Sequence, residues 1–388
     1  MYMMAFLFWL SAGVIIYIYI GYPLLIALLA KLRPKPVRRT QIQPSVTLLI
    51  AAYNEEDVIR EKIENSINLN YPKNKLEIVI VADGSTDRTC SIVREYHHLG
   101  VVLHDRPERK GKLAALNRVV PLTHGEIILF SDANNMFRPD AVSKLASNFW
   151  DPNVGAVTGK KLLFKTKSGL GESENLYWRY ESFIRAKESQ FNSTTGVAGE
   201  ILSIRRDLYI PTRDSIINDD LFIAMQVVKQ GYRVIYEPEA ISEELPIASI
   251  KDELIRRARI SAGYYQLIRE LLLLLPSAPF FVFQAISHKL LRPFVPFFMI
   301  IALLTNLSLV MTESHSNIIM IALAIAQLFF YILAAIGFCL SKFRVELKPF
   351  FVPYYFCYSN FSYLLGLFKF LFGKQNVLWE KPSRESEP

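Results

Sequence analysis

The sequence predicts an α/β protein in which a doubly wound, mostly parallel sheet, with helices on both faces, is flanked by transmembrane helices. Short apolar runs alternate with helical patterns between about residues 44 and 164, which is typical of βαβ units. Long apolar segments lie on either side of this part, while charge is concentrated between Lys31 and Arg269. With 388 residues, 51% of them hydrophobic, the chain can build a sizeable core and still present apolar helices to lipid.

Five apolar runs are expected to form the strands of the sheet. Between them, apolar residues recur at helical spacing, as Ile59, Ile63 and Ile67 do in the first helix. Because crossovers between parallel strands are right-handed, this order places helices on both faces of the sheet. The expected strands cover residues 45–52, 76–82, 101–104, 127–131 and 154–163.

Three segments are long and apolar enough for a helix that crosses a hydrocarbon core, namely residues 5–30, 293–312 and 318–340. A fourth segment, 349–372, contains Pro353, Asn360 and Lys369, so spanning, re-entrant and interfacial arrangements all stay open. A cleaved signal peptide is disfavoured at the N-terminus, because no basic region precedes the apolar stretch. Five basic residues within 31–39 follow it and predict a cytoplasmic central domain.

The chain is therefore divided into five regions. Residues 1–31 form an N-terminal transmembrane helix, and 44–248 form a cytoplasmic α/β domain. Interfacial amphipathic helices follow at 249–292, then C-terminal transmembrane segments at 293–373 and a cytoplasmic basic tail at 374–388. This division predicts a multi-pass protein of the cell membrane.

Charge and cysteine content exclude some classes of protein. The net charge of +8 lies largely beside the apolar segments, where it suits lipid headgroups better than nucleic acid, and no nucleic-acid motif accompanies it. The three cysteines show no metal-binding spacing, which argues against a disulfide scaffold.

Acidic and amide residues follow three of the expected strands directly. They are Glu55, Asp83, Asp87, Asp132 and Asn134. Open parallel sheets bind ligands at the carboxyl ends of their strands, and carboxylates gathered there suit a divalent metal and a nucleotide. Taken singly, the motifs also fit turns and helix caps. The Gly-rich dinucleotide fingerprint and the P-loop are both missing from the sequence.

Basic and acidic candidates lie further along the chain. Lys112 belongs to a basic loop that fits either a phosphate clamp or a solvated surface. Asp219 and Asp220 open a helix, where they either cap it or act on an acceptor hydroxyl as a general base and its neighbour. Arg259 lies in a basic amphipathic helix at 252–275, suited to the membrane interface or to a diphosphate.

Taken together and in this order, the motifs between Val46 and Gly263 resemble those of the membrane-bound family 2 glycosyltransferases, the group of cellulose, hyaluronan and poly-N-acetylglucosamine synthases. The resemblance implies a GT-A-like domain, a nucleotide-sugar donor and Mg²⁺ or Mn²⁺. It also implies roles for individual residues. The donor would be bound by Tyr53, Glu55, Asp83, Lys112, Asp132 and Arg259, the metal by Asp132 and Asn134, and the acceptor by Gly199, Arg205, Arg206 and Asp219, with Asp220 as catalytic base.

Two departures from the family pattern affect the expected product. Asn134 stands where the family has a metal-binding Asp. Arg256 and Ile260 stand where the motif Gln-x-x-Arg-Trp has Gln and Trp, which removes an aromatic platform for a growing polymer. The departures favour transfer of one or a few sugars over processive synthesis.

The resemblance implies an inverting transferase that moves a sugar from a nucleotide-diphosphate donor, with a UDP-sugar favoured, to a saccharide or lipid-linked acceptor. Polysaccharide or glycolipid synthesis would be its context. Expected partners are the donor, the acceptor, membrane lipids and a second copy or an accessory membrane subunit, with no nucleic acid. The alternative is a catalytically silent membrane scaffold subunit that keeps the fold.

Overall fold

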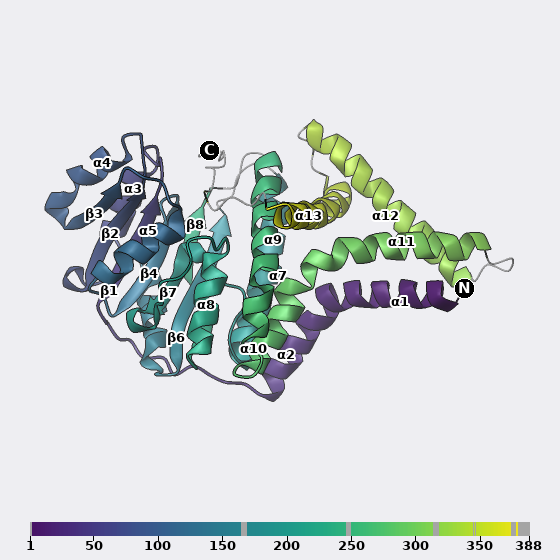
Figure 1. Cartoon of the computed structure of the whole chain (residues 1–388), viewed down its shortest axis with the longest axis horizontal. Helices are drawn as coiled ribbons and strands as arrows, with labels where there is room; N and C mark the ends of the chain where they lie inside the picture. The colour runs from purple at the N-terminus through teal and green to yellow at the C-terminus, as the bar shows by residue number, and fades with distance from the viewer. Residues whose placement is uncertain are drawn as a thin grey trace.

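The computed structural model describes residues 2–163, 169–245, 250–312, 318–343, 345, 347–373 and 378. An α/β domain forms one side of the molecule and long apolar helices extend from the other (Figure 1).

The α/β domain is built on an eight-stranded sheet with the order β3-β2-β1-β4-β7-β6-β8-β5. The first four strands in this order are parallel, as predicted, whereas β7 runs antiparallel to both its neighbours and β5 antiparallel to β8. The doubly wound α/β prediction is confirmed, and the sheet is mixed beyond β4. The strands are β1 (Val46–Ala52), β2 (Leu76–Asp83), β3 (Val101–Arg106), β4 (Ile127–Asp132), β5 (Asn135–Phe137), β6 (Val154–Leu163), β7 (Leu202–Arg205) and β8 (Arg233–Glu244).

Helices cover both faces of the sheet. On one face lie α3 (Ile59–Ile67), α4 (Thr89–Glu95) and α6 (Ala141–Ser147), and on the other α5 (Lys112–Val119) and α8 (Asp219–Lys229). Every residue of β1 is buried, and Leu48 and Leu49 contribute to the two opposite cores. This explains why the central strand reads as a continuous apolar run.

The remaining α-helices form the apolar part of the molecule and its connections to the sheet. They are α1 (Tyr2–Ile16), α2 (Tyr22–Leu32), α7 (Gly169–Phe191), α9 (Ile250–Leu272), α10 (Pro279–Ala285), α11 (Val295–Thr312), α12 (Ile318–Lys342) and α13 (Lys348–Leu371). A π-helical turn, Tyr17–Gly21, joins α1 to α2, and another, Ile286–Leu290, follows α10.

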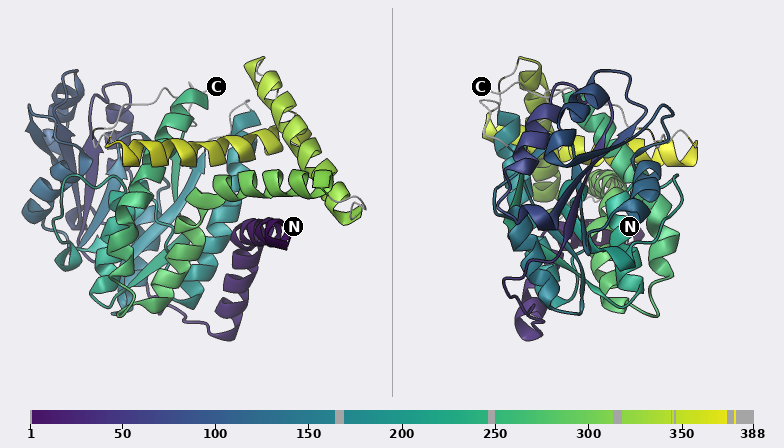
Figure 2. Two further views of the ribbon diagram at one scale, coloured as in Figure 1. Left: turned by 45° about the vertical axis from the view of Figure 1, so that its right-hand side comes forward. Right: turned by 90° about the vertical axis from the view of Figure 1, so that its left-hand side faces the viewer.

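Three helical stretches among the described residues are long and apolar enough to cross a membrane. They are Tyr2–Leu32, Pro279–Thr312 and Ile318–Lys342. The helix α13, which covers the fourth segment up to Leu371, is not one of these and packs along α9 and α12. Figure 2 shows it (yellow) running beside α11 towards the α/β domain. The predicted basic tail lies outside the described residues except for Leu378.

Candidate active site

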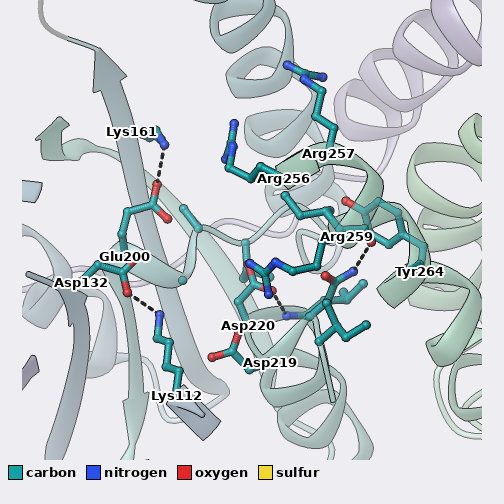
Figure 3. Close-up of a pocket in the computed structure, with 18 of the residues that line it drawn as sticks. Lys112, Asp132, Lys161, Glu200, Asp219, Asp220, Arg256, Arg257, Arg259 and Tyr264 are labelled. Atoms are coloured by element: carbon teal, nitrogen blue, oxygen red, sulfur yellow. Dashed lines mark hydrogen bonds and ion pairs between the residues drawn. The ribbon is translucent and has the colours of Figure 1, made fainter. Parts of the chain in front are cut away.

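A pocket of about 640 Å³ lies between the carboxyl ends of the parallel strands and the helices α7, α8, α9 and α13 (Figure 3). Its sheet end includes Glu55, Lys112 and Asp132. Its other end includes Trp178 and Arg185 of α7. One continuous space therefore joins the expected donor site to the apolar half of the molecule.

The strand register brings the predicted loops together at one edge of the sheet. Ala51 of β1 pairs with Asp132 of β4, and Ala52 pairs with Ala82 of β2. The two loops are joined by Asn54, whose φ of +52° turns its carboxamide oxygen to accept a 2.8 Å hydrogen bond from the Thr86 N–H. Asparagine tolerates this left-handed conformation better than most residues.

Asp83 and Tyr53 organise a loop beside the pocket. Asp83 is 4% exposed, and its two oxygens accept hydrogen bonds from the N–H groups of Lys110 (2.9 Å) and Gly111 (2.6 Å). The Arg109 guanidinium lies 3.6 Å from the centre of the Tyr53 ring. Neither Asp83 nor Tyr53 is among the described residues that line the pocket, and both contact the 109–111 loop instead.

Lys112 and Asp132 form an ion pair at the sheet end of the pocket, where the donor was expected. The Lys112 Nζ donates to Asp132 Oδ1 at 2.5 Å. Burial alone would lower the pKa of Lys112, but the carboxylates of Asp132 and Asp219 outweigh it and hold that pKa above its ordinary value. Lys112 is therefore a permanent cation at the place where a diphosphate would meet the sheet.

The side chains of Asp132 and Asn134 fit a metal that arrives with a nucleotide. Both residues line the pocket at the end of β4. Within the part of the chain that the structure describes, no group of three or more His, Cys, Asp or Glu side chains is arranged so that it could hold a metal ion by itself. One carboxylate and one amide oxygen suit Mg²⁺ or Mn²⁺ when substrate phosphates supply further ligands.

A residue that the sequence reasoning missed holds this turn in place. The Asn135 carboxamide is fully buried and donates to the Ser242 hydroxyl at 2.6 Å and to the Glu200 carbonyl at 3.1 Å. Lys62, also fully buried, donates to the Asn135 carbonyl and places its Nζ 4.2 Å from the Phe137 ring centre. The sequence held one signal of this role: Lys62 lies on the apolar face of the predicted first helix, where a charged side chain is unusual.

Asp220 lies opposite the Lys112–Asp132 pair, at the first turn of α8. Burial raises the pKa of Asp220 to about 6, with a further contribution from Asp219. Gly199 packs directly against it, because a Cβ added there would lie 3.2 Å from the Asp220 Cβ. A larger residue at position 199 would require Asp220 to shift, and the contact brings the predicted acceptor-side Gly199 next to the predicted base.

Helix α9 closes the pocket above Asp220. Gly263 packs on the side chain of Asn218, whose amide donates to the Ile260 carbonyl at 2.9 Å. Arg259 projects towards Asp219 and Asp220 in Figure 3. Burial lowers the pKa of Arg259, and Asp219 opposes this effect. The guanidinium therefore belongs to a residue of the pocket wall and lies near the carboxylates of Asp219 and Asp220.

The structure corrects the predicted position of Arg205 and Arg206. Arg205 pairs with Ile127 at the start of β4, the opposite end of that strand from Asp132. The Arg205 side chain donates to the carbonyls of Val154, Phe149 and Asp151, and Arg206 donates to that of Thr123. Neither arginine lines the pocket, so the acceptor-binding prediction is wrong for these two residues. They instead satisfy carbonyls at the bottom of the sheet.

The family model described as Glycosyl transferase family 2 matches residues 47–211. The chain therefore carries a glycosyltransferase family 2 domain and is an enzyme of the sugar-transferring class. The matched region holds the sheet edge and the Lys112–Asp132 pair. The helices α1 and α2 precede it, and α8, α9 and the later apolar helices follow it.

Similar proteins extend this result beyond the matched region. The chain is 27% identical over 373 residues to the probable glycosyltransferase YdaM of Bacillus subtilis (strain 168), covering 89% of this chain and 88% of that protein. It is 26% identical over 243 residues to poly-beta-1,6-N-acetyl-D-glucosamine synthase of Staphylococcus aureus (strain MSSA476), covering 61% of this chain but only 58% of the synthase.

A solved structure shares the whole architecture. The mannosyltransferase PcManGT from Pyrobaculum calidifontis, in complex with GDP-Man and Mn²⁺, has a TM-score of 0.73 and 25% sequence identity. The similarity covers 95% of this chain and 99% of that one. It therefore includes the apolar helices as well as the α/β domain.

Proposed function

We propose that the protein is an inverting transferase that moves a sugar from a nucleotide-diphosphate donor, with a UDP-sugar as the favoured donor, to an acceptor hydroxyl. The observation that carries this proposal is the single pocket in which Asp220 faces the Lys112–Asp132 pair. The family 2 domain supports the reaction class. The GDP-Man bound to the similar mannosyltransferase makes GDP-mannose the second donor to test.

The pocket supplies a base on one side and positive charge on the other. Asp220 takes the proton of the acceptor hydroxyl, whose oxygen forms a bond to the anomeric carbon. The bond from that carbon to the diphosphate breaks at the same time, and its electrons leave with the nucleotide diphosphate. Lys112 and Arg259 offset the negative charge that develops there. A divalent cation held by Asp132 and Asn134 would supply additional charge neutralisation at the diphosphate.

The acceptor is proposed to be a saccharide or a lipid-linked sugar at the cytoplasmic face of the cell membrane. Two features support this placement. The pocket wall includes residues of α13 and of the apolar stretch that begins at Pro279. The basic residues of 31–39 directly follow the first apolar helix. The similarity to poly-N-acetylglucosamine synthase supports polysaccharide synthesis as the context.

The test is nucleotide diphosphate release by the full chain in nanodiscs, with Mg²⁺ or Mn²⁺ and a panel of UDP-sugars and GDP-mannose. We expect turnover with at least one donor and a loss of about 10²–10⁴-fold in Asp220→Asn, the usual contribution of a general base. Asp207→Asn is the matched control, because that side chain is 93% exposed.

Three results would count against the proposal. Unchanged turnover in Asp220→Asn would show that Asp220 is not the catalytic base. Retained anomeric configuration in the product would show that the transfer is not inverting. A folded protein that binds no nucleotide diphosphate would favour the silent scaffold instead.

A further inference from the structure

The far end of the pocket contains a buried arginine with an unmatched charge. Arg185 of α7 is 5% exposed and lines the pocket. Its guanidinium stacks over the Trp178 ring at 5.3 Å, and its Nε–H has no hydrogen-bond acceptor. Among the described residues it forms no ion pair. Buried charges are normally paired, because an isolated one is costly to remove from water.

The neighbouring charges do not compensate Arg185. Glu181 accepts hydrogen bonds from both Lys289, at 3.0 Å, and Arg292. Glu188 accepts from the hydroxyls of Tyr22, at 2.6 Å, and of Thr195. His288 also contacts both carboxylates, Glu181 at 3.2 Å and Glu188 at 2.9 Å. The partners of Glu181 and Glu188 are therefore other groups, and among the described residues neither carboxylate forms an ion pair with Arg185.

The arginine lies on the acceptor side of Asp220. A Cβ added to Gly196 would lie 2.7 Å from Arg185 Cγ and Nε, and one added to Gly199 would lie 3.2 Å from Asp220 Cβ. The segment 196–199 thus separates the two side chains and spans at most about 10 Å. Both glycines of this motif make room for a functional side chain.

The walls around Arg185 belong to helices that meet the membrane segments. Lys289 lies in the π-helical turn of the apolar stretch Pro279–Thr312. Helix α7 packs on α2, and the Tyr22–Glu188 hydrogen bond joins them. The cationic end of the pocket is therefore next to the apolar helices rather than next to the sheet.

We propose that Arg185, with Lys289 beside it, binds a phosphate group on a lipid-borne acceptor. A guanidinium matches phosphate oxygens in a bidentate manner, and a phosphate would supply the counter-charge that Arg185 lacks. The sugar hydroxyl carried by the same lipid would then reach Asp220 across the 196–199 segment. This inference rests on the proposed function, since it names the acceptor class of the same pocket.

The experiment measures binding of farnesyl phosphate to the full chain in detergent by isothermal titration calorimetry, beside farnesol and inorganic phosphate. We expect farnesyl phosphate to bind more tightly than either, and Arg185→Met to weaken it at least tenfold. The control is Arg179→Met on the same helix, because Arg179 is exposed. Equal binding of farnesyl phosphate by both variants, or no preference over farnesol, would overturn the phosphate subsite.

The inorganic phosphate arm separates the two sources of the anion. Similar affinities for inorganic phosphate and farnesyl phosphate, both lost in Arg185→Met, would support the phosphate subsite. They would overturn the inference that the phosphate is carried by a lipid.

A second pair of measurements separates a ligand role from a structural one. Methionine removes an unmatched charge, so Arg185→Met should unfold at the same temperature as the parent or higher and should bind nucleotide diphosphate equally well. A lower unfolding temperature together with weaker nucleotide binding would assign Arg185 to the structure and overturn the inference. Absence of donor turnover in the parent chain would contradict the proposed function alone, because lipid phosphate binding is scored independently.

Discussion

Asp220 illustrates how an active-site residue can oppose the stability of the fold that holds it. Burial and the neighbouring Asp219 raise its pKa to about 6, whereas an aspartate in an unfolded chain titrates near 3.9. The folded protein therefore binds a proton at this site more tightly than the unfolded chain. The associated stabilisation is fully present below about pH 4 and is lost as the pH rises through about 6.

We predict that Asp220→Asn unfolds at a higher temperature than the parent protein at pH 8, because the amide removes the buried charge. The difference should shrink as the pH falls and disappear near pH 4, where the parent carboxyl is protonated. Thermal unfolding of both proteins between pH 4 and 8 measures this. A difference in unfolding temperature that does not change with pH would contradict the raised pKa of Asp220. So would an asparagine variant that is less stable than the parent at pH 8.

The same titration predicts a pH profile for the reaction. Since Asp220 must be ionised to accept a proton, kcat/KM should increase about tenfold per pH unit below about pH 6 and level off above it. Initial rates at low donor concentration provide the measurement. The control is nucleotide diphosphate affinity over the same range, which must not reproduce the profile.

Asn134 allows a direct test of how the metal is held. Replacing it by aspartate adds a carboxylate ligand beside Asp132, and hard divalent cations bind carboxylate oxygens more strongly when more negative charge is present. In Asn134→Asp, the Mn²⁺ concentration for half-maximal nucleotide binding should fall severalfold, and EDTA should abolish the difference. An unchanged Mn²⁺ dependence would place the metal away from this residue.

At the scale of elements, the turn after β4 is held by segments that are distant in sequence. Asn135 joins it to β8 through Ser242 and to the Gly199 region through the Glu200 carbonyl. Asn135→Ala leaves these partners buried without their donor, which costs about 1–3 kcal/mol. It should raise KM for the donor more than it lowers kcat. Asn70→Ala, an exposed position, is the control, and equal losses in both variants would refute the positioning role.

The contrast between predicted and missed elements has a physical basis. The parallel strands β1, β2 and β4 were predictable because both of their faces are largely buried, which makes their apolar runs continuous. β5 has three residues and β7 has four, too short for any periodicity, and β8 contains Pro238 and several acids. The residues of the site at the sheet edge followed from strand order, whereas Arg185 and Asn135 depend on contacts between segments far apart in sequence.

At the scale of the whole molecule, the direction in which each apolar helix runs can be read from their packing. Phe8 of α1, Leu309 of α11 and Met320 of α12 form one buried cluster, at the end of these helices farthest from the sheet (Figure 1). The chain thus runs from that end to the α/β domain through α1 and α2. It then runs from the α/β domain to the cluster end through α11, and away from the cluster end again through α12.

This arrangement, with the basic residues after α2, predicts that the cluster end faces the outside and the α/β domain the cytoplasm. In a background lacking Cys90, Cys339 and Cys357, a membrane-impermeant maleimide should label Tyr2→Cys and Met311→Cys in intact cells. Both positions are highly exposed. Leu99→Cys, in the α/β domain, should react only after permeabilisation. If only Leu99→Cys were labelled in intact cells, the topology would be the reverse of the predicted one. Different behaviour of Tyr2→Cys and Met311→Cys would show that one of their helices does not cross, since the structure places both at the same end.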